Sequence, residues 1–101
     1  MILYNVTITI DSGIEEEWLQ WMKEKHIPDV MKTGMFTDSR ICRLLNQPKE
    51  GDSTYVIKYA CAGKENYKRY LEEFAPALRE EFNQRYKDKF VADRRVMEVL
   101  E

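Results

Sequence analysis

Twice along this chain, a segment with the alternating pattern of a β-strand leads into a segment with the spacing of an amphipathic helix. Residues 2–10 alternate between apolar and polar side chains, and the apolar ones are mostly β-branched, which is typical of a strand with one buried face. Helical spacing follows, with an apolar stripe at Ile14, Trp18, Trp21 and Met22. The first part of the chain is therefore predicted to be a strand followed by a helix.

The rest of the chain extends this order through a hairpin. Residues 36–45 and 54–62 predict two further strands, joined by the turn-rich loop NQPKEGDS (46–53). Helical spacing returns at 64–86, and residues 89–100 predict the last strand. The order βαββαβ with two right-handed crossovers predicts an α+β fold, the ferredoxin-like sandwich, with antiparallel sheet order 4-1-3-2 and both helices on one face. We expect residues 1–101 to form a single domain of this kind.

The two predicted helices share a short pattern, EKHIPDV in the first and EEFAPAL in the second. The match aligns His26 with Phe74 and Pro28 with Pro76. A proline lacks the backbone N–H, and its ring collides with the carbonyl four residues earlier, so each helix should end, kink or restart near its proline. The match also predicts that His26, like Phe74, points towards the sheet.

The composition argues against polyanionic partners and membranes. The net charge is −2, with basic and acidic residues mixed along the chain, so bulk attraction to nucleic acid or to an anionic membrane is not expected. The chain starts directly with the first strand, without a signal-peptide pattern, and no apolar run is long enough to span a membrane. Cys42 and Cys61 have neither CxxC nor zinc spacing, which indicates ordinary reduced thiols and a cytoplasmic protein.

The sheet face that the helices leave uncovered has a mixed composition. By alternation it should carry Leu3, Asn5, Thr7, Thr9, Ile41, Arg43, Val56 and Lys58. A second copy packed sheet against sheet would bury the apolar members of this set and let the polar ones pair. A chain of this size buries only about 60–65% of its unfolded surface, so it gains from such a partner. We therefore expect a homodimer.

Four segments carry a resemblance that runs the whole length of the chain: MILYNVTITID, EEEWLQWMKEKHIPDVMKTGMF, APALREEF and DKFVADRRVMEVL. They resemble an uncharacterised bacterial family of domain-of-unknown-function type within the dimeric α/β-barrel superfamily. The resemblance implies two ferredoxin-like subunits joined by their sheets, each with a pocket between sheet and helices. The superfamily includes haem-degrading and quinone-forming monooxygenases, lactone isomerases and proteins without known activity, so the resemblance implies a fold more than a reaction. The family tends to have histidine where this chain has Phe74.

His26 is the candidate around which a site can be built. An imidazole can act as acid, base or ligand near neutral pH, and the resemblance implies that it can pair with an aspartate at the start of the second strand, here Asp38. If the hairpin closes symmetrically on Asn46 and Ser53, Asp38, Arg40 and Cys42 face the helices opposite Cys61, Tyr59 and Ile57. His26 and Asp38 are then candidate catalytic residues, and Arg40, Tyr59 and Trp21 are candidate ligand-binding residues.

Each of these residues also has a structural interpretation. A satisfied, half-buried helix-end histidine is the favoured interpretation of His26 over a catalytic one, and Trp21 fits the core better than a cofactor site. A one-residue slip in the hairpin would scatter the set. No metal or cofactor is expected, because one histidine without an adjacent carboxylate motif gives no recognisable ligand set. Arg94 and Arg95 point to opposite faces of the last strand, and whether either binds an anion is left open.

Two functions from different classes fit this sequence. In the first, the dimer binds a small, partly apolar molecule in the pocket near His26, with or without acid–base chemistry. In the second, it is a non-catalytic interaction module whose pocket is filled by its own tryptophan and tyrosine rings. A monooxygenase or isomerase of the superfamily type ranks below both. The resemblance implies that haem-degrading chemistry needs a histidine on the second helix and an asparagine that faces the helices. Here the second helix lacks histidine, and Asn5 falls on the uncovered face.

Overall fold

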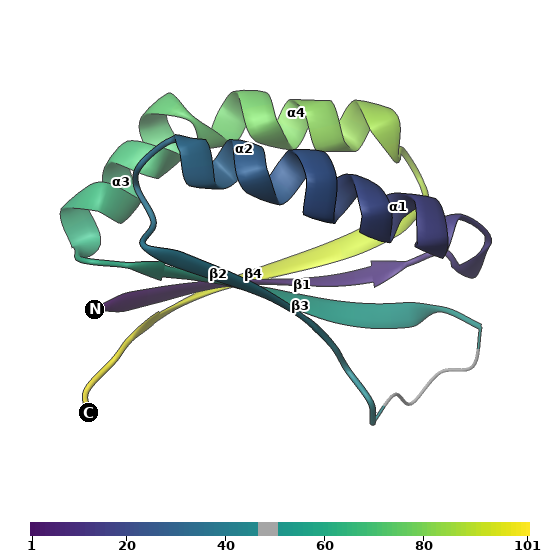
Figure 1. The fold of residues 1–101 in the computed structure, drawn as a ribbon, viewed down its shortest axis with the longest axis horizontal. Helices are drawn as coiled ribbons and strands as arrows, with labels where there is room; N and C mark the ends of the chain where they lie inside the picture. The colour runs from purple at the N-terminus through teal and green to yellow at the C-terminus, as the bar shows by residue number, and fades with distance from the viewer. Residues whose placement is uncertain (47–50) are drawn as a thin grey trace.

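The computed structural model describes residues 1–46 and 51–101 and consists of one sheet beneath one layer of helices (Figure 1). The predicted loop at 46–53 lies partly, at 47–50, outside the described residues. Within the described ranges, no helix is long and apolar enough to cross a membrane.

The sheet is antiparallel and has four strands in the order β2-β3-β1-β4. The strands are β1 (Ile2–Ile10), β2 (Asp38–Arg43), β3 (Ser53–Cys61) and β4 (Phe90–Glu98). This order is the predicted 4-1-3-2 read from the other edge, so the ferredoxin-like α+β fold is confirmed. β1 lies in the centre of the sheet, and each of its apolar side chains on the helix side is buried.

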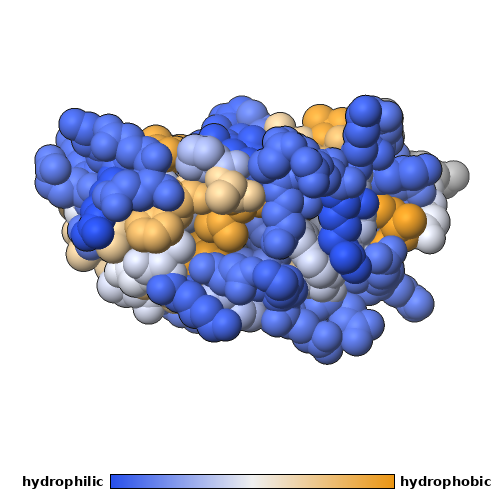
Figure 2. Space-filling model, turned by 90° about the horizontal axis from the view of Figure 1, so that it is seen from above, coloured by the Kyte–Doolittle hydropathy of each residue, from blue (hydrophilic) through white to orange (hydrophobic). Residues whose placement is uncertain are grey.

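The two predicted helices each consist of more than one segment. The first crossover contains η1 (Ser12–Ile14), α1 (Glu15–Trp21), the π-helical turn η2 (Met22–His26) and α2 (Ile27–Lys32). The second contains α3 (Lys64–Glu73) and α4 (Ala75–Arg85). Both crossovers cover the same face of the sheet (Figure 1). The outer surface of this helix layer is mainly hydrophilic (Figure 2), so the apolar stripes of the helices are used against the sheet.

The two prolines restart their helices in different ways. Before Pro28, the Ile27 N–H donates to the Met22 carbonyl, five residues earlier, as in a π-helix. This wider turn places Pro28 in the first turn of α2, where a missing N–H costs little. Before Pro76, the helix breaks instead at Phe74, whose φ is −121° and ψ −41°. The prediction of an end, kink or restart at both prolines is confirmed.

The pairing of β2 with β3 differs by one residue from the predicted hairpin. Arg40 lies opposite Lys58, and Ile41 lies opposite Ile57, whereas symmetric closure would have put Arg40 opposite Tyr59. Because side chains alternate along a strand, the shift moves every side chain of β2 to the other face. The observed register puts Ile41 against the core and leaves Cys42 exposed, which buries the larger apolar side chain.

This register corrects the predicted faces of five residues. Asp38, Arg40 and Cys42 lie on the face away from the helices, and Ile41 and Arg43 lie on the face towards them. Cys42 is therefore exposed, while Cys61 is buried on the helix side. The two thiols project from opposite faces of the sheet, and a disulfide requires Cα atoms within about 7 Å and side chains that face each other.

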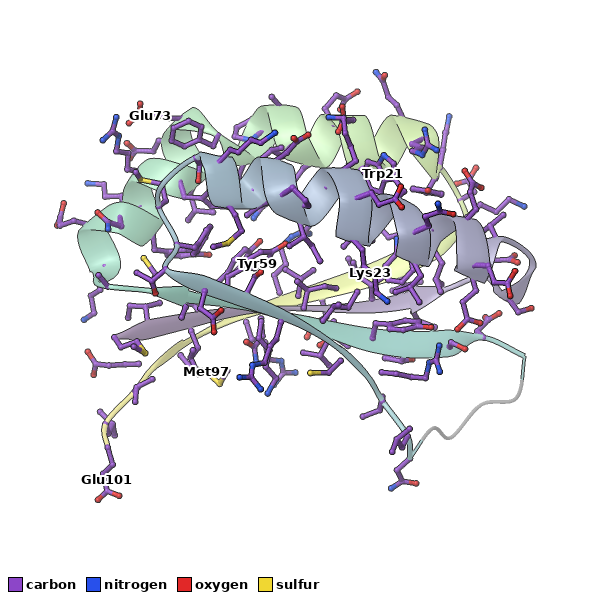
Figure 3. The ribbon with its side chains drawn as sticks, viewed as in Figure 1. Trp21, Lys23, Tyr59, Glu73, Met97 and Glu101 are labelled. Carbon is purple, nitrogen blue, oxygen red and sulfur yellow. The ribbon has the colours of Figure 1, made fainter. Side chains whose placement is uncertain are left out.

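The open face is the sheet surface that the helices leave uncovered, and it is mixed, as predicted for β1. Figure 3 shows Met97 projecting from it, below the sheet. By alternation along β4, Val91 lies on the same face as Met97. Val91 is 71% exposed, and Met97 is 41% exposed. Asp93 and Arg95 form an ion pair of 3.0 Å on this face. The Asn5 Oδ1 atom is buried and has no hydrogen-bond partner among the described residues.

Candidate functional site

His26 ends the π-helical turn, and its ring lies on the inner side of the helix layer among aromatic rings. The ring centroid is 5.0 Å from that of Trp21, with 27° between the two planes, and 5.3 Å from that of Phe82, which meets it edge-on. The prediction that this side chain points inward is confirmed. The π-turn contributes to this placement because it inserts an extra residue into the helix and changes the direction of the side chains that follow.

The surroundings of His26 favour its neutral form. Burial lowers the pKa of the imidazole to about 4, and the positive charges of Lys25 and Arg94 act in the same direction, against the carboxylate of Asp29. The Nδ1 atom is buried and lacks a hydrogen-bond partner in the part of the chain that the structure describes. At neutral pH the ring is therefore uncharged, with one polar atom unsatisfied.

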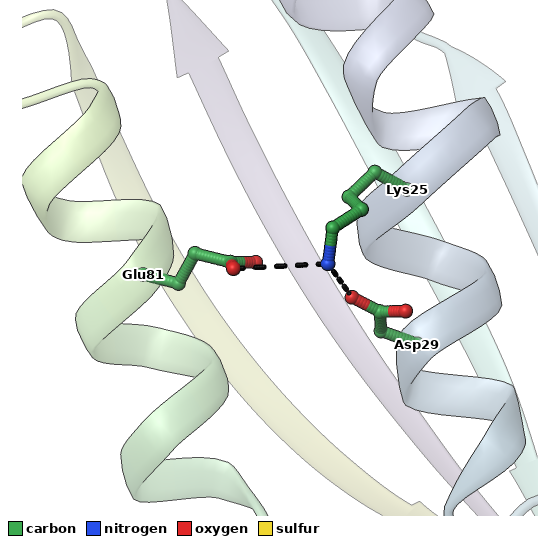
Figure 4. Close-up of polar contacts among 3 residues, drawn as sticks. All are labelled: Lys25, Asp29 and Glu81. Atoms are coloured by element: carbon green, nitrogen blue, oxygen red, sulfur yellow. Dashed lines mark hydrogen bonds and ion pairs between the residues drawn. The ribbon is translucent and has the colours of Figure 1, made fainter.

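A small charged cluster ties the two helical crossovers together next to His26 (Figure 4). The Lys25 ammonium forms an ion pair with Asp29, and its Nζ lies 3.7 Å from a carboxylate oxygen of Glu81 on α4. Asp29 accepts a hydrogen bond from Lys25. Lys25 and Glu81 are exposed and Asp29 is half-buried, so solvent screens these pairs and they contribute little to stability.

A pocket opens between the sheet and the helices beside this ring. Its apolar walls come from both layers: Val6, Ile8, Met22, Ile57, Leu78, Phe82, Phe90 and Ala92. Its polar lining consists of Tyr4, His26, Tyr59, Tyr70, Arg79 and Arg94. The cavity that these side chains enclose is narrow, with a volume of about 30 Å³. A ligand larger than a few water molecules therefore has to displace part of the lining.

The polar groups of the pocket come from distant parts of the chain. Arg79 on α4 donates from Nη2 to the Tyr4 hydroxyl on β1 at 3.0 Å, and its Nε is buried with no hydrogen-bond partner among residues 1–46 and 51–101. Arg94 lies opposite Val6, on the helix side of β4. Burial raises the pKa of Tyr59 and of Tyr70, so both hydroxyls keep their protons.

The predicted site is assembled only in part. His26 and Tyr59 both line the pocket, and Figure 3 shows Tyr59 between the helices and the sheet. The placement of Asp38 and Arg40 beside them was wrong, because the β2–β3 register turns both side chains to the open face. Trp21 does not line the pocket but stacks on His26 from outside it. The Arg85 guanidinium lies 5.5 Å from the centroid of the Trp21 ring.

Sequence reasoning missed Arg79 as a pocket residue. Arg79 lies four residues after the buried Ala75 and three before the buried Phe82, so helical spacing places it on the inner side of α4. A charged residue at an inward position was the signal that could have found it. For Arg94 the signal was its position on β4, two residues after Ala92 and four after Phe90, which places it on the same face of the strand as these two residues.

A second polar cluster lies at the start of β3 and holds neighbouring elements together. Glu15 accepts hydrogen bonds from the Ser53 hydroxyl at 2.9 Å and from the Tyr55 hydroxyl at 2.5 Å. The Tyr55 oxygen also accepts from Nε and Nη2 of Arg43 at 3.1 and 3.0 Å. These bonds join α1 to β3 and β2, and none of the four residues lines the pocket.

The described residues offer no site for a metal ion. Within 1–46 and 51–101, no group of three or more histidine, cysteine, aspartate or glutamate side chains lies close enough to hold one. The polar groups of the pocket are arginines, tyrosines and one histidine, which suit hydrogen bonding to an organic molecule or an anion.

A family comparison covers nearly the whole chain. The profile of a domain of unknown function, DUF4286, matches residues 1–100. The chain belongs to the DUF4286 family. No curated protein matches this DUF4286 chain.

Solved structures share the fold of this DUF4286 protein at low sequence identity. A dimeric ferredoxin-like protein from an uncultured marine organism has a TM-score of 0.70 and 14% identity, with 100% of this chain and 96% of that chain covered. HapK from Hahella chejuensis has a TM-score of 0.72 and 12% identity, over 99% and 93%. The haem degrader MhuD from Mycobacterium tuberculosis, solved with two haems in its active site, has a TM-score of 0.64 and 16% identity, over 100% and 97%.

These structural similarities establish the fold, whereas any chemistry has to be inferred from the residues of the site. The family match confirms the resemblance to a family of unknown function, and the structural neighbours confirm the ferredoxin-like fold. Asn5, one of the residue types that the resemblance connects with haem degradation, pairs in register with Lys58 and lies on the open face, away from the pocket.

Proposed function

We propose that this DUF4286 protein is a cytoplasmic homodimer that binds a small, partly apolar molecule in the pocket between its sheet and helices, beside His26. The observation that carries the proposal is the pocket itself, in which apolar walls from both layers surround a few inward polar groups. The buried, unpartnered Nδ1 of His26 lies at its edge and is a group that a ligand could satisfy.

The open face supports the homodimer. Val91 and Met97 are exposed apolar side chains on it, next to both acidic and basic residues, and Asn5 carries a buried amide oxygen without a described partner. A copy of the same face supplies apolar contacts and charges of both signs, as a two-fold interface requires. One of the structural neighbours is itself a dimeric ferredoxin-like protein.

Binding is better supported than catalysis. A general base works best when its pKa lies near the operating pH, and the pKa of His26 is lowered by burial to about 4. Asp38, the expected orienting carboxylate, lies on the other face of the sheet. A monooxygenase or isomerase of the superfamily type therefore stays the weaker proposal.

The narrowness of the pocket favours one alternative function. The cavity volume is only about 30 Å³, and three tyrosine rings, those of Tyr4, Tyr59 and Tyr70, are part of its lining. A protein whose pocket is filled by its own rings would act as a non-catalytic interaction module. The two functions differ in whether a ligand can move Arg94, the exposed member of the lining, and enter.

A pocket-filling variant separates these functions. Ala92 lines the pocket from β4, so Ala92→Phe should occupy the space that a ligand needs. The matched control is Ala77→Phe, at an exposed position on α4. A small-molecule library is screened by NMR of the single imidazole. We expect some compounds to shift the His26 resonances in the parent and in Ala77→Phe but not in Ala92→Phe. If no compound shifts His26, or if Ala92→Phe binds equally well, the proposal is wrong.

A further inference from the structure

Two arginines face the pocket from opposite layers of the fold. Arg79 comes from α4 and Arg94 from β4, and both line the same space. Burial raises the pKa of Tyr70, with Tyr4 acting in the same direction, while Arg79 and Arg94 both lower it. The same two arginines act on Tyr67. Arg79 donates to the Tyr4 hydroxyl, and Tyr4 pairs with Val96, two residues from Arg94 on β4. Both arginines therefore lie towards the Tyr4 end of the pocket.

These two guanidiniums lack the carboxylate partners that three of the other arginines have, and among the described residues Arg40 and Arg43, outside the pocket, form no ion pair either. Arg69, Arg85 and Arg95 each form an ion pair with a carboxylate, at 2.7, 3.1 and 3.0 Å. Neither Arg79 nor Arg94 forms one with any residue of 1–46 or 51–101. The Nε of Arg79 is buried and unpartnered among these residues. A buried donor of a charged group that lacks an acceptor is costly, and a carboxylate is the acceptor that fits a guanidinium best.

The pocket is polar at one end and apolar at the other. The strand register places Tyr4 and Val6 beside Val96 and Arg94, and it places Ile8 beside Ala92. Phe82 and Phe90, whose ring centroids are 4.5 Å apart, extend the apolar end. No aspartate or glutamate within the described ranges lines this space. The lining therefore has its two positive charges towards Tyr4 and mostly aliphatic and aromatic walls towards Phe90, where the neutral ring of His26 packs against Phe82.

We propose that the ligand of this pocket is a small amphipathic carboxylate, whose anionic group binds between Arg79 and Arg94 and whose apolar body lies against Ile8, Phe82 and Phe90. This assignment rests on the proposed binding function and specifies its ligand class. The carboxylate supplies an acceptor for the buried Nε of Arg79 and a counter-charge for both guanidiniums, and the tyrosine hydroxyls can donate to its remaining lone pairs. Arg94, which is exposed, is the side chain that can swing aside to admit the ligand and close over it.

Matched pairs of compounds test the charge requirement. Hexanoate, octanoate and phenylacetate are each compared with the amide of the same skeleton, so that size and apolar surface stay nearly constant while the charge is removed. Binding is followed by titration calorimetry and by the His26 imidazole resonances. We expect at least one carboxylate to bind at about millimolar concentration or tighter, and its amide to bind about tenfold more weakly, the size of one charge-assisted hydrogen bond.

Variants then assign the effect to the two arginines. Arg94→Gln removes an exposed guanidinium with little risk to folding, whereas Arg79→Gln also removes the hydrogen bond to Tyr4. The control is Arg69→Gln, which removes the same charge from an exposed position on α3. We expect Arg94→Gln and Arg79→Gln each to weaken carboxylate binding about tenfold and to leave amide binding unchanged. Arg94→Lys should recover part of the affinity, and Arg69→Gln should match the parent.

The outcomes distinguish this inference from the function on which it rests. If the amides bind as tightly as the carboxylates, or if Arg94→Gln binds like the parent, the carboxylate assignment is wrong and the binding function stands. If no compound of either charge binds and none of a wider library shifts the His26 resonances, both are wrong. Should Arg79→Gln fail to fold, Arg94→Gln alone decides the charge requirement.

Discussion

The imidazole of His26 stacks on the indole of Trp21, with 5.0 Å between the ring centroids and 27° between the ring planes. Phe82 meets the same imidazole edge-on. In this surrounding the neutral imidazole packs as an aromatic ring, which explains how it can occupy the place that Phe74 has in the other helical crossover. The charged form would lose the benefit of this packing, because burial disfavours an imidazolium.

Acid should destabilise the protein through His26. The pKa is 6.5 for an unperturbed imidazole and about 4 here, so between these values the unfolded chain binds the proton and the folded chain does not. The stability that the neutral ring supplies is complete above pH 6.5 and is lost as the pH falls towards 4. We expect this loss to reach about 3 kcal/mol. It is measured as the difference in pH dependence of urea unfolding between the parent and His26→Phe, in which Asp29, Lys25 and Arg94 are unchanged. Parallel pH profiles would contradict the prediction.

Replacement of His26 by phenylalanine should cost little at neutral pH. The substitution removes a buried Nδ1 that lacks a described hydrogen-bond partner and keeps the stacking on Trp21. We expect the free energy of unfolding at pH 7 to change by less than about 1 kcal/mol, in either direction. This outcome would mean that the fold does not need the ring nitrogens and would favour a role in binding. A loss of about 1–3 kcal/mol would instead identify a structural hydrogen bond.

Tyr55→Phe should destabilise the fold measurably. The Tyr55 hydroxyl donates to Glu15 and accepts from Arg43, so its removal leaves a carboxylate and a guanidinium without this partner. We expect a loss of about 1–3 kcal/mol in chemical unfolding. Tyr67→Phe is the control, because the Tyr67 hydroxyl makes no hydrogen bond within the described ranges and should change stability far less. Equal effects of the two substitutions would show that the cluster around Tyr55 contributes little.

A charge on the open face should separate the subunits. Val91→Asp places a carboxylate at an apolar position that is 71% exposed in the single chain and that a sheet-to-sheet dimer would bury. We expect light scattering at micromolar concentration to report a dimer for the parent and a folded monomer for Val91→Asp, because a buried unpaired charge costs several kcal/mol. Ala77→Asp, on the exposed side of α4, should remain dimeric. A parent protein that is monomeric would refute the dimer.

Much of this fold could be predicted from hydrophobic periodicity. The alternation of residues 2–10 identified β1 and its buried face, and the helical stripes identified both crossovers. The order of these elements then left one favourable topology. His26 and Tyr59 could be placed in the pocket because each belongs to an element whose inward face is visible in the sequence.

The rest of the site depended on contacts between elements. Symmetric closure of the hairpin was the simplest assumption, and it put Asp38 and Arg40 on the wrong face, since a shift of one residue in pairing reverses every side chain of β2. Arg79 escaped notice because charged residues on helices are usually solvated, and only the packing of α4 over β1 shows that its guanidinium reaches Tyr4.

Local patterns were enough to predict the order of strands and helices, the buried face of β1 and the restart of both helices at their prolines. Packing between distant segments fixes the register of β2, the π-helical turn that places His26 beside Trp21, and the presence of Arg79 and Arg94 in one pocket. The difference lies in the range of the interactions. Periodicity and proline geometry act within a few residues, whereas register and the convergence of charges depend on which arrangement of distant segments buries the most apolar surface.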